Sequence, residues 1–327
     1  MPHLIHLFSR RRFLTTSGAA ALAVTAGCSG ASEQSAAGSA GNTVEAAANP
    51  AVRYEFIRNA TARLHYAGKR LLLDPMLSAK GALPSFADIA PNPTVELPVP
   101  AAGIVRDIDT VIVSHMHSDH FDDAAADLLP KSIPMVTCAN SYSPDFAKPD
   151  DRVSFQAALQ DKGFTDVTAI STDEAAPTTL GDITIRQVWG RHGRGEVGQL
   201  LGNVNGIVLQ AEGHPTIYWA GDTILDDAEM TAILTRFRPD IVIAHTGGPV
   251  IEAISPELLL MDAAQGMRLF RMAEEANANV RMIAVHMGAL DHCFSTRDQL
   301  RTAMADLDPG RAARIAIPAD GETLDFA

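Results

Sequence analysis

Cysteine and basic residues are both scarce in this chain. Its 327 residues include three cysteines, too few for a disulfide framework, so folding depends on a packed core and on any bound metal. Residues 1–28 carry three arginines and no acid, which leaves 23 basic against 39 acidic residues in the remainder, a net charge of −16. Phosphate backbones repel such a body, so nucleic acid is excluded as a general partner.

Long apolar runs and internal repeats are also missing. The run from Thr15 to Ala26 is too short to span a membrane as a stable helix, and no short-period repeat is visible. What is present is an apolar fraction of 46% and a charged fraction of 20%, values typical of a globular protein with a full core. The 11 histidines are notable because imidazole is the commonest metal ligand near neutral pH.

The N-terminus has the order of an export signal. Ser9-Arg10-Arg11-Arg12-Phe13-Leu14 resembles a bacterial twin-arginine signal peptide, and Thr25-Ala26-Gly27-Cys28 resembles a lipobox. The second resemblance implies a lipid anchor on Cys28, and the alternative is ordinary cleavage near Ala26. In either case we expect a protein of the bacterial periplasm that meets the membrane only through this segment.

Three segments follow from this composition. Residues 1–28 are the signal peptide, and residues 29–50, rich in Ser, Ala and Gly, cannot bury enough surface to fold and form a flexible tether. Residues 51–327 form one catalytic domain.

Within this domain, short β-prone runs alternate with turn residues and amphipathic stretches. A proline-rich stretch from Pro84 to Pro100 predicts a long surface loop over one side of the site. Strands in two groups with helices between them indicate an α/β layered body with the helices outside. The predicted strands are Val52–Ile57, Thr61–Tyr66, Lys69–Asp74, Asp109–Ser114, 134–137, 166–170, 183–188, 206–211, 216–220, 240–244 and 281–286, and the predicted helices are Asp122–Leu129, 226–237, 256–277 and 296–306.

The run His115-Met116-His117-Ser118-Asp119-His120 places four metal-ligand side chains within six residues, directly after a predicted strand. In a loop, these side chains fan to two sides, which suits two neighbouring metals. Nitrogen and carboxylate ligands without thiolate favour zinc, manganese or iron(II). More ligand-type residues follow predicted strands further along: His192, Asp222 in Gly221-Asp222, and His286.

The order of these residues resembles the metallo-β-lactamase superfamily. Its members carry H-x-H-x-D-H, then a His, a Gly-Asp and a final His, and here 77, 30 and 64 residues separate the successive elements. The resemblance implies an αββα sandwich. It also implies one metal on His115, His117 and His192, a second metal on Asp119, His120 and His286, and Asp222 bridging both.

Within the superfamily, the chain resembles the branch of ascorbate-6-phosphate lactonases and N-acyl-phosphatidylethanolamine phospholipases. The phrases Leu71–Pro75, Ser114–Asp122 and Tyr218–Thr223 carry this resemblance. Two divalent ions, with zinc as the first choice and manganese or iron(II) as alternatives, share a water and lower its pKa, so that hydroxide is the nucleophile. The resemblance also gives Asp119 a catalytic part, orienting that hydroxide or carrying its proton.

Two further histidines are candidate catalytic residues. His245 ends a predicted strand and His292 lies six residues after His286, so each is either a second-shell partner or a proton donor to the leaving group. His292 is also the rival of His286 for the last metal position. Arg191 and Arg194 flank His192, where they either bind an anionic substrate or face solvent.

The expected reaction is hydrolysis of a lactone, amide or phosphodiester in a small-molecule or lipid substrate. One alternative is a non-catalytic metal-binding member of the fold, but no ligand position is lost. Another is iron-dependent redox chemistry, as in flavodiiron proteins, which carry a Glu where this chain has His117. The loops 76–108 and 138–165 are expected to set specificity, and they contain no motif that identifies the substrate or the oligomeric state.

Overall fold

The computed structural model describes residues 51–145 and 148–326. The predicted signal peptide, lipobox and tether lie outside these residues. Among the described helices, none has both the length and the apolar character needed to cross a membrane.

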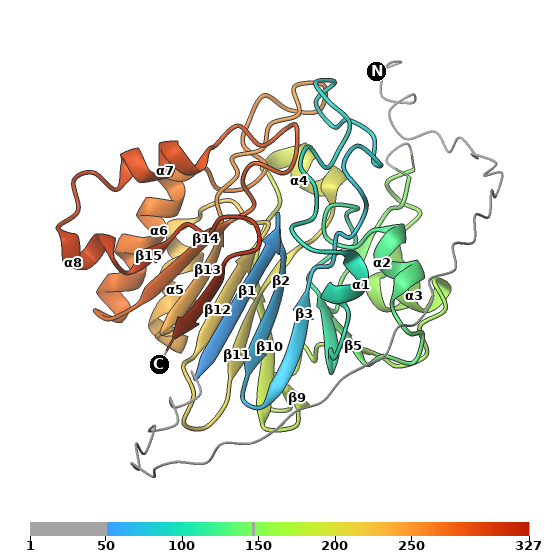
Figure 1. Cartoon of the computed structure of the whole chain (residues 1–327), viewed down its shortest axis with the longest axis horizontal. Coiled ribbons are helices and arrows are strands. Elements are labelled where there is room, and N and C mark those ends of the chain that lie inside the picture. The colour runs from blue at the N-terminus through green and yellow to red at the C-terminus, as the bar shows by residue number, and fades with distance from the viewer. Residues whose placement is uncertain (1–50, 146–147, 327) are drawn as a thin grey trace, which may run out of the picture.

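Two seven-stranded sheets face each other (Figure 1). The first has the order β16 (Thr323–Phe326), β1 (Val52–Arg58), β2 (Thr61–Tyr66), β3 (Lys69–Leu73), β4 (Thr110–Val113), β5 (Met135–Thr137), β8 (Val167–Ala169). The second has the order β15 (Ile315–Ala316), β14 (Arg281–Val285), β13 (Ile241–His245), β12 (Ile217–Gly221), β11 (Asn205–Gln210), β10 (Ile183–Trp189), β9 (Thr178–Leu180).

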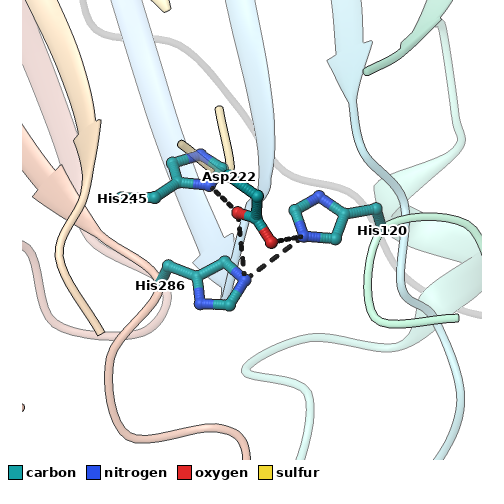
Figure 2. Close-up of side chains that lie close together, drawn as sticks. All are labelled: His120, Asp222, His245 and His286. Atoms are coloured by element: carbon teal, nitrogen blue, oxygen red, sulfur yellow. Dashed lines mark hydrogen bonds and ion pairs between the residues drawn. The ribbon is translucent and has the colours of Figure 1, made fainter. Parts of the chain in front are cut away.

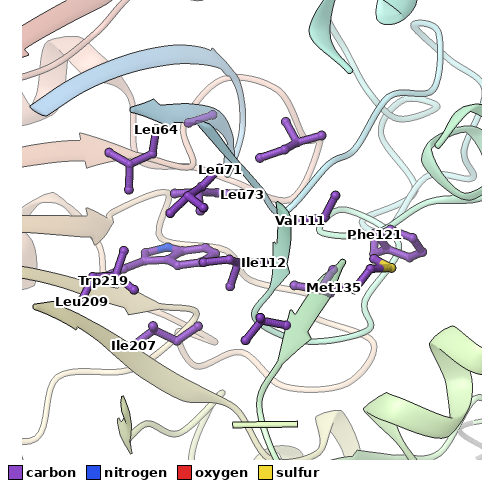
Figure 3. Close-up of a cluster of buried hydrophobic side chains, with 14 of the residues drawn as sticks. Leu64, Leu71, Leu73, Val111, Ile112, Phe121, Met135, Ile207, Leu209 and Trp219 are labelled. Atoms are coloured by element: carbon purple, nitrogen blue, oxygen red, sulfur yellow. The ribbon is translucent and has the colours of Figure 1, made fainter. Parts of the chain in front are cut away.

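Side-chain alternation explains why the second sheet is covered on both faces. Ile207, Leu209 and Trp219 point toward the first sheet, where they meet Leu64, Leu71 and Ile112 in one apolar core (Figure 3). The intervening Val208 and Tyr218 point the other way, into a second core shared with helices. Because successive strand residues face opposite sides, one apolar run supplies both cores.

Helices flank the pair of sheets (Figure 1). The outer face of the second sheet carries α5 (Asp227–Phe237), α6 (Ala263–Ala276) and α7 (Arg297–Ala303), whose apolar sides enter the second core. On the side of the first sheet lie α1 (Ala101–Ile104), α2 (Asp123–Leu128) and α3 (Phe155–Asp161). The predicted αββα sandwich is confirmed.

The predicted helix at 256–277 was wrong over its first turns. The helix begins at Ala263, where the Asp262 side chain accepts a hydrogen bond from the backbone nitrogen of Gln265 and caps it. The preceding residues form no helix. Among them, the backbone nitrogen of Leu259 donates to the Pro249 carbonyl.

Several short elements had no counterpart in the prediction. The expected loop 138–165 contains α3 and a hairpin of β6 (Ser141–Tyr142) and β7 (Val153–Ser154). Three further helices, α1, α4 (Gly195–Leu201) and α8 (Pro309–Ala312), and the edge strands β9, β15 and β16 complete the set. Each has at most seven residues, too few to produce a clear hydrophobic period.

Candidate metal centre

The histidine run lies on a tight loop directly after β4. The backbone nitrogens of His120 and Phe121 both donate to the His117 carbonyl, at 3.0 and 2.9 Å. Asn59, in the turn between β1 and β2, donates its side-chain amide to the Asp119 carbonyl at 3.0 Å. These bonds hold the loop folded back on itself, so its side chains project to two sides.

The remaining ligand-type residues come from strand ends of the second sheet. His192 follows β10, Asp222 follows β12 and His286 follows β14. β12, β13 and β14 are parallel, and β10 runs in the same direction because two antiparallel pairings separate it from β12. Their carboxyl ends therefore meet at one edge of the sheet, opposite the loop after β4.

Positive backbone φ angles turn the chain at this edge. Gly221 has a φ of 67°, and His286 has a φ of 66° although it is not glycine. Left-handed backbone is uncommon for a residue with a side chain and is retained where surrounding contacts enforce it. Here the His286 backbone nitrogen donates to the Asn59 carbonyl at 2.9 Å, which ties the second sheet to the turn that holds Asp119.

One group of ligand atoms consists of three imidazoles. Nε2 of His115 lies 3.1 Å from Nδ1 of His117. Ligand atoms of His115, His117 and His192 all lie within 4.8 Å of one another. Burial is the largest influence on all three rings, and it lowers the pKa of each. The neutral imidazole is the form that binds a metal.

A second group surrounds the Asp222 carboxylate (Figure 2). Nε2 of His120 lies 3.0 Å from Oδ2 of Asp222 and 3.2 Å from Nε2 of His286. Oδ2 of Asp119 approaches Nε2 of His286 to 3.3 Å. Burial opposes a charge on the His120 and His286 rings. Asp222 opposes burial most strongly at both rings, with Asp119 at His120 and with Cys293 and Asp119 at His286, and both pKa values rise well above the ordinary value.

Each of these five histidines turns one ring nitrogen to the centre and gives the other to an outer partner. Such partners fix the orientation of metal-binding imidazoles and tune their basicity. They are Ser114 Oγ for His115 (3.0 Å), the Leu201 carbonyl for His117 (2.9 Å), Asp74 Oδ2 for His120 (2.6 Å), the Leu259 carbonyl for His192 (2.9 Å) and Cys293 Sγ for His286 (3.6 Å). The converging nitrogen and carboxylate oxygen atoms fit divalent metal ions.

His245 lies behind Asp222 and does not face the pocket. Its Nδ1 is 2.6 Å from Oδ1 of Asp222, and its Nε2 accepts a hydrogen bond from Nε1 of Trp219 at 2.9 Å. An indole nitrogen only donates, so the proton of a neutral His245 is on Nδ1 and points at Asp222. Both ring nitrogens are thereby used inside the protein.

A pocket of about 300 Å³ opens over the metal-ligand side chains. His117, Asp119, His192 and Asp222 line it together with His292. Most of its remaining wall is apolar: Leu83, Phe86, Met116, Phe121, Leu201, Ile251, Ile254 and Leu259. The pocket therefore has a largely apolar wall around the side chains of the candidate metal centre, and Ser118, Asp122, Asp123, Ser143 and Lys162 also line it.

Comparison with known proteins identifies this arrangement. Residues 69–287 match the family described as "Beta-lactamase superfamily domain". The chain belongs to this superfamily. The Bacillus subtilis protein named UPF0173 protein YddR is 32% identical over 275 residues, which cover 83% of this chain and 98% of that protein.

Two solved structures resemble the chain. An isothiocyanate hydrolase from Delia radicum gut bacteria is 33% identical, with a TM-score of 0.70, covering 84% of this chain and 99% of that one. A possible metal-dependent hydrolase from Veillonella parvula is 28% identical, with a TM-score of 0.71 and the same coverage. The chain is accordingly a metal-dependent hydrolase of the beta-lactamase superfamily. Its resemblance to the lactonase and phospholipase branch stays a prediction.

The fold brings together every residue that the superfamily motif predicted as a metal ligand. His115, His117, Asp119, His120, His192, Asp222 and His286 all converge, whereas His292 lies in the pocket wall without a hydrogen bond to any of them. Arg191 and Arg194 are exposed and do not line the pocket, and Arg194 donates to the Leu225 carbonyl. The possibility that they bind an anionic substrate has no support in this geometry.

Sequence reasoning missed the supports behind the ligands. Asn59 and Trp219 carry no ligand-type side chain, so nothing in the sequence marks them as supports. The Leu201 and Leu259 partners act through backbone carbonyls, so their side chains give no signal. Behind the metal loop, the Asp74 carboxylate accepts from Ser114 and contacts His120.

Proposed function

We propose that this chain is a dinuclear hydrolase that holds two divalent ions, zinc being the first candidate. His115, His117 and His192 would hold one ion, Asp119, His120 and His286 would hold the other, and Asp222 would serve both. The observation that carries this proposal is the position of Asp222. Its Oδ2 lies 3.0 Å from Nε2 of His120, 3.5 Å from Nε2 of His192 and 3.8 Å from Nε2 of His115, so one oxygen faces both groups.

Two ions bound in this way supply hydroxide near neutral pH by lowering the pKa of a shared water. The protein contributes orientation and charge. Asp119 lines the pocket and is positioned to orient the attacking group or accept its proton. His245 donates to Asp222 and is proposed to hold that carboxylate in place, the second-shell alternative of the two roles considered for it.

Apart from the bound ions, the pocket as described offers no free positive side chain to a negatively charged substrate. Lys162 is the one Lys or Arg side chain in its described lining, and it forms a 2.7 Å ion pair with Asp123. A phosphodiester would therefore find no free cationic side chain in the described pocket. We propose an uncharged molecule that presents an electrophilic carbon and an apolar group, such as an amide or a lactone.

The relative named as an isothiocyanate hydrolase adds a specific candidate. An organic isothiocyanate is uncharged and apolar, and its central carbon is electrophilic. Addition of one water would release an amine and carbonyl sulfide, with all atoms accounted for. Phenethyl isothiocyanate is accordingly the first substrate to test, beside a model lactone and an N-acyl amide.

Metal analysis and kinetics test the proposal together. Protein purified without chelator should contain close to two transition-metal ions per chain by mass spectrometry, and Asp222→Ala should lose metal and turnover. His65→Ala is a control, because His65 pairs with Glu55 on β1, away from the metal ligands. A metal content near zero in the wild type would refute the metal centre. Faster turnover of bis-p-nitrophenyl phosphate than of all three uncharged substrates would refute the substrate class.

We also propose that residues 1–28 direct export to the periplasm and that Cys28 carries a lipid. Cell fractionation tests the first point: an Arg10→Lys, Arg11→Lys double variant should remain in the cytoplasm. Mass spectrometry of the mature N-terminus tests the second, since Cys28→Ser should abolish any lipid mass. An unlipidated wild-type N-terminus after Ala26 would favour the soluble periplasmic alternative.

A further inference from the structure

His292 is a buried histidine that the metal centre does not use. Its side chain lines the pocket beside His117, His192 and Asp222, and the residue is only 6% exposed. Nδ1 is buried without a hydrogen-bond partner, and Oδ1 of Asp291, at 3.9 Å, lies beyond hydrogen-bond distance from it. Polar groups that are buried without a partner are uncommon in proteins, because each costs the hydrogen bonds it made to water. An imidazole in a pocket wall that has lost its hydrogen bonds to water and gained none from the protein is a candidate for binding a ligand.

The position of the His292 ring is fixed by its surroundings. The ring of Phe86 meets it edge to face, with centroids 5.1 Å apart and planes at 88°. The His292 carbonyl accepts a hydrogen bond from the Val250 backbone nitrogen at 3.0 Å. The free ring nitrogen is therefore not the result of a loose side chain.

The neighbouring Asp291 holds the loop that carries Phe86. Its carboxylate accepts hydrogen bonds from the backbone nitrogens of Phe86 and Ala87, both at 3.1 Å, and from the Asn92 side-chain amide at 2.8 Å. Ser85 also donates to it. One carboxylate thus locks the 85–92 loop against residues 291–292, so Phe86 and His292 form a single rigid wall. Binding groups held by such supports lose little entropy when a ligand arrives.

Burial disfavours a positive charge on the His292 ring. Burial lowers the pKa of the ring to about 4, so it is neutral at physiological pH. A neutral imidazole has one N–H donor and one acceptor nitrogen. It therefore recognises a substrate heteroatom by a directed hydrogen bond and not by charge, in agreement with the apolar side chains that line the pocket.

We propose that His292 is a substrate-binding residue whose ring hydrogen-bonds the heteroatom attached to the carbon under attack, while Phe86 packs against the apolar group of the substrate. This inference rests on the proposed hydrolase function, because it assigns the bond that orients the substrate of the same site. His292 transfers no proton in this role. This role differs from both roles considered in the sequence analysis. His292 contacts the substrate and not a metal ligand, and it orients the substrate without donating a proton to the leaving group.

A matched control exists elsewhere in the chain. His214 also has a buried Nδ1 without a partner and also meets an aromatic ring, that of Tyr66, at a centroid distance of 5.6 Å. It does not line the pocket. His292→Leu and His214→Leu therefore remove the same chemical group from similar surroundings, and only the first removes it from the proposed substrate site.

The test uses metal-loaded enzyme and two measurements. Calorimetry measures binding of 4-phenyl-2-butanone, an uncharged ketone that carries the phenethyl group and has no hydrolysable bond, and kinetics measures kcat/KM for phenethyl isothiocyanate. His292→Leu should weaken binding and lower kcat/KM by about tenfold each, with metal content unchanged, since one hydrogen bond is lost. His292→Asn, which keeps a donor and an acceptor, should recover part of the loss and serves if the Leu variant does not fold. His214→Leu should match the wild type.

Several outcomes would overturn the assignment. They are unchanged probe binding in His292→Leu, an equal loss in His214→Leu, loss of metal from His292→Leu, and no probe binding by the wild type. The proposed hydrolase function fails separately, by absence of turnover of every uncharged substrate in metal-loaded wild type. In that case a selective loss of probe binding in His292→Leu would still support the assignment of His292.

Discussion

Nε1 of Trp219 donates a hydrogen bond to Nε2 of His245 at 2.9 Å, deep between the two sheets. Because the indole nitrogen can only donate, it determines which nitrogen of a neutral His245 carries the proton. That proton is directed at Oδ1 of Asp222, 2.6 Å away. A core tryptophan thus controls the orientation of the carboxylate that we propose to bridge two metals.

Replacing His245 should weaken metal binding as well as catalysis. We expect His245→Ala to lower zinc affinity or kcat by about 10- to 100-fold, the usual effect of losing an outer partner of a metal ligand. His245→Asn keeps a donor toward Asp222 and should lose less. Chelator competition measures the affinity. A fall in kcat with unchanged zinc affinity would instead indicate that His245 transfers a proton.

Metal uptake should release protons. Asp222 above all raises the pKa values of both His120 and His286 above their usual range. A metal ligand must be deprotonated, so binding at the second group should release protons, and affinity should fall as pH falls. Calorimetry of zinc binding in two buffers with different ionisation enthalpies counts the protons. Identical binding enthalpies in both buffers would contradict the prediction.

Asp291 should stabilise the fold at neutral pH through the loop it holds. Burial disfavours its charge, but hydrogen bonds from Ser85, Asn92 and the loop backbone keep its pKa well below the ordinary value. A carboxyl whose pKa is lower in the folded state stabilises the fold at pH values above its unfolded-state pKa. This stability disappears as the pH falls through its folded-state pKa. We expect Asp291→Asn to cost about 1–3 kcal/mol at pH 7 in urea unfolding, and less in acid.

Asp325→Asn is the control for this experiment. Asp325 pairs with Arg53 at 2.8 Å on the surface, and both side chains are more than 40% exposed. Exposed ion pairs contribute little because water screens them. Equal losses in the two variants would mean that Asp291 has no special part in holding the loop.

Gly247 should not tolerate a side chain. An added Cβ would lie 2.0 Å from the His286 carbonyl oxygen, so the backbone beside that proposed ligand would have to shift. We expect Gly247→Ala to destabilise the protein by about 3 kcal/mol and to reduce metal content. Gly103→Ala in α1 is the control, because nothing lies within 4 Å of its added Cβ. Thermal unfolding and metal analysis compare the two, and similar unfolding temperatures would contradict the prediction.

Local patterns predicted the central strands and the metal-ligand side chains. β2 was predicted with its observed bounds, and the histidine run was expected after a strand, where it lies. Both depend on residues close together in the chain: a strand on the alternation of its own side chains, and the run on ligand types within six positions. The edge strand β16 was not predicted, because its four residues become a strand only by pairing with β1.

The sequence by itself determined which side chains are available as ligands and the order in which strands deliver them. The tertiary structure decided what surrounds each one. Residues 256–262 were expected in a helix, but they run across the site and supply the Leu259 carbonyl to His192. His245 and His292 looked alike in the sequence, yet His245 is hydrogen-bonded on both ring nitrogens and Nδ1 of His292 is buried without a hydrogen-bond partner. That difference comes from partners far along the chain, which only the packing of the two sheets brings together.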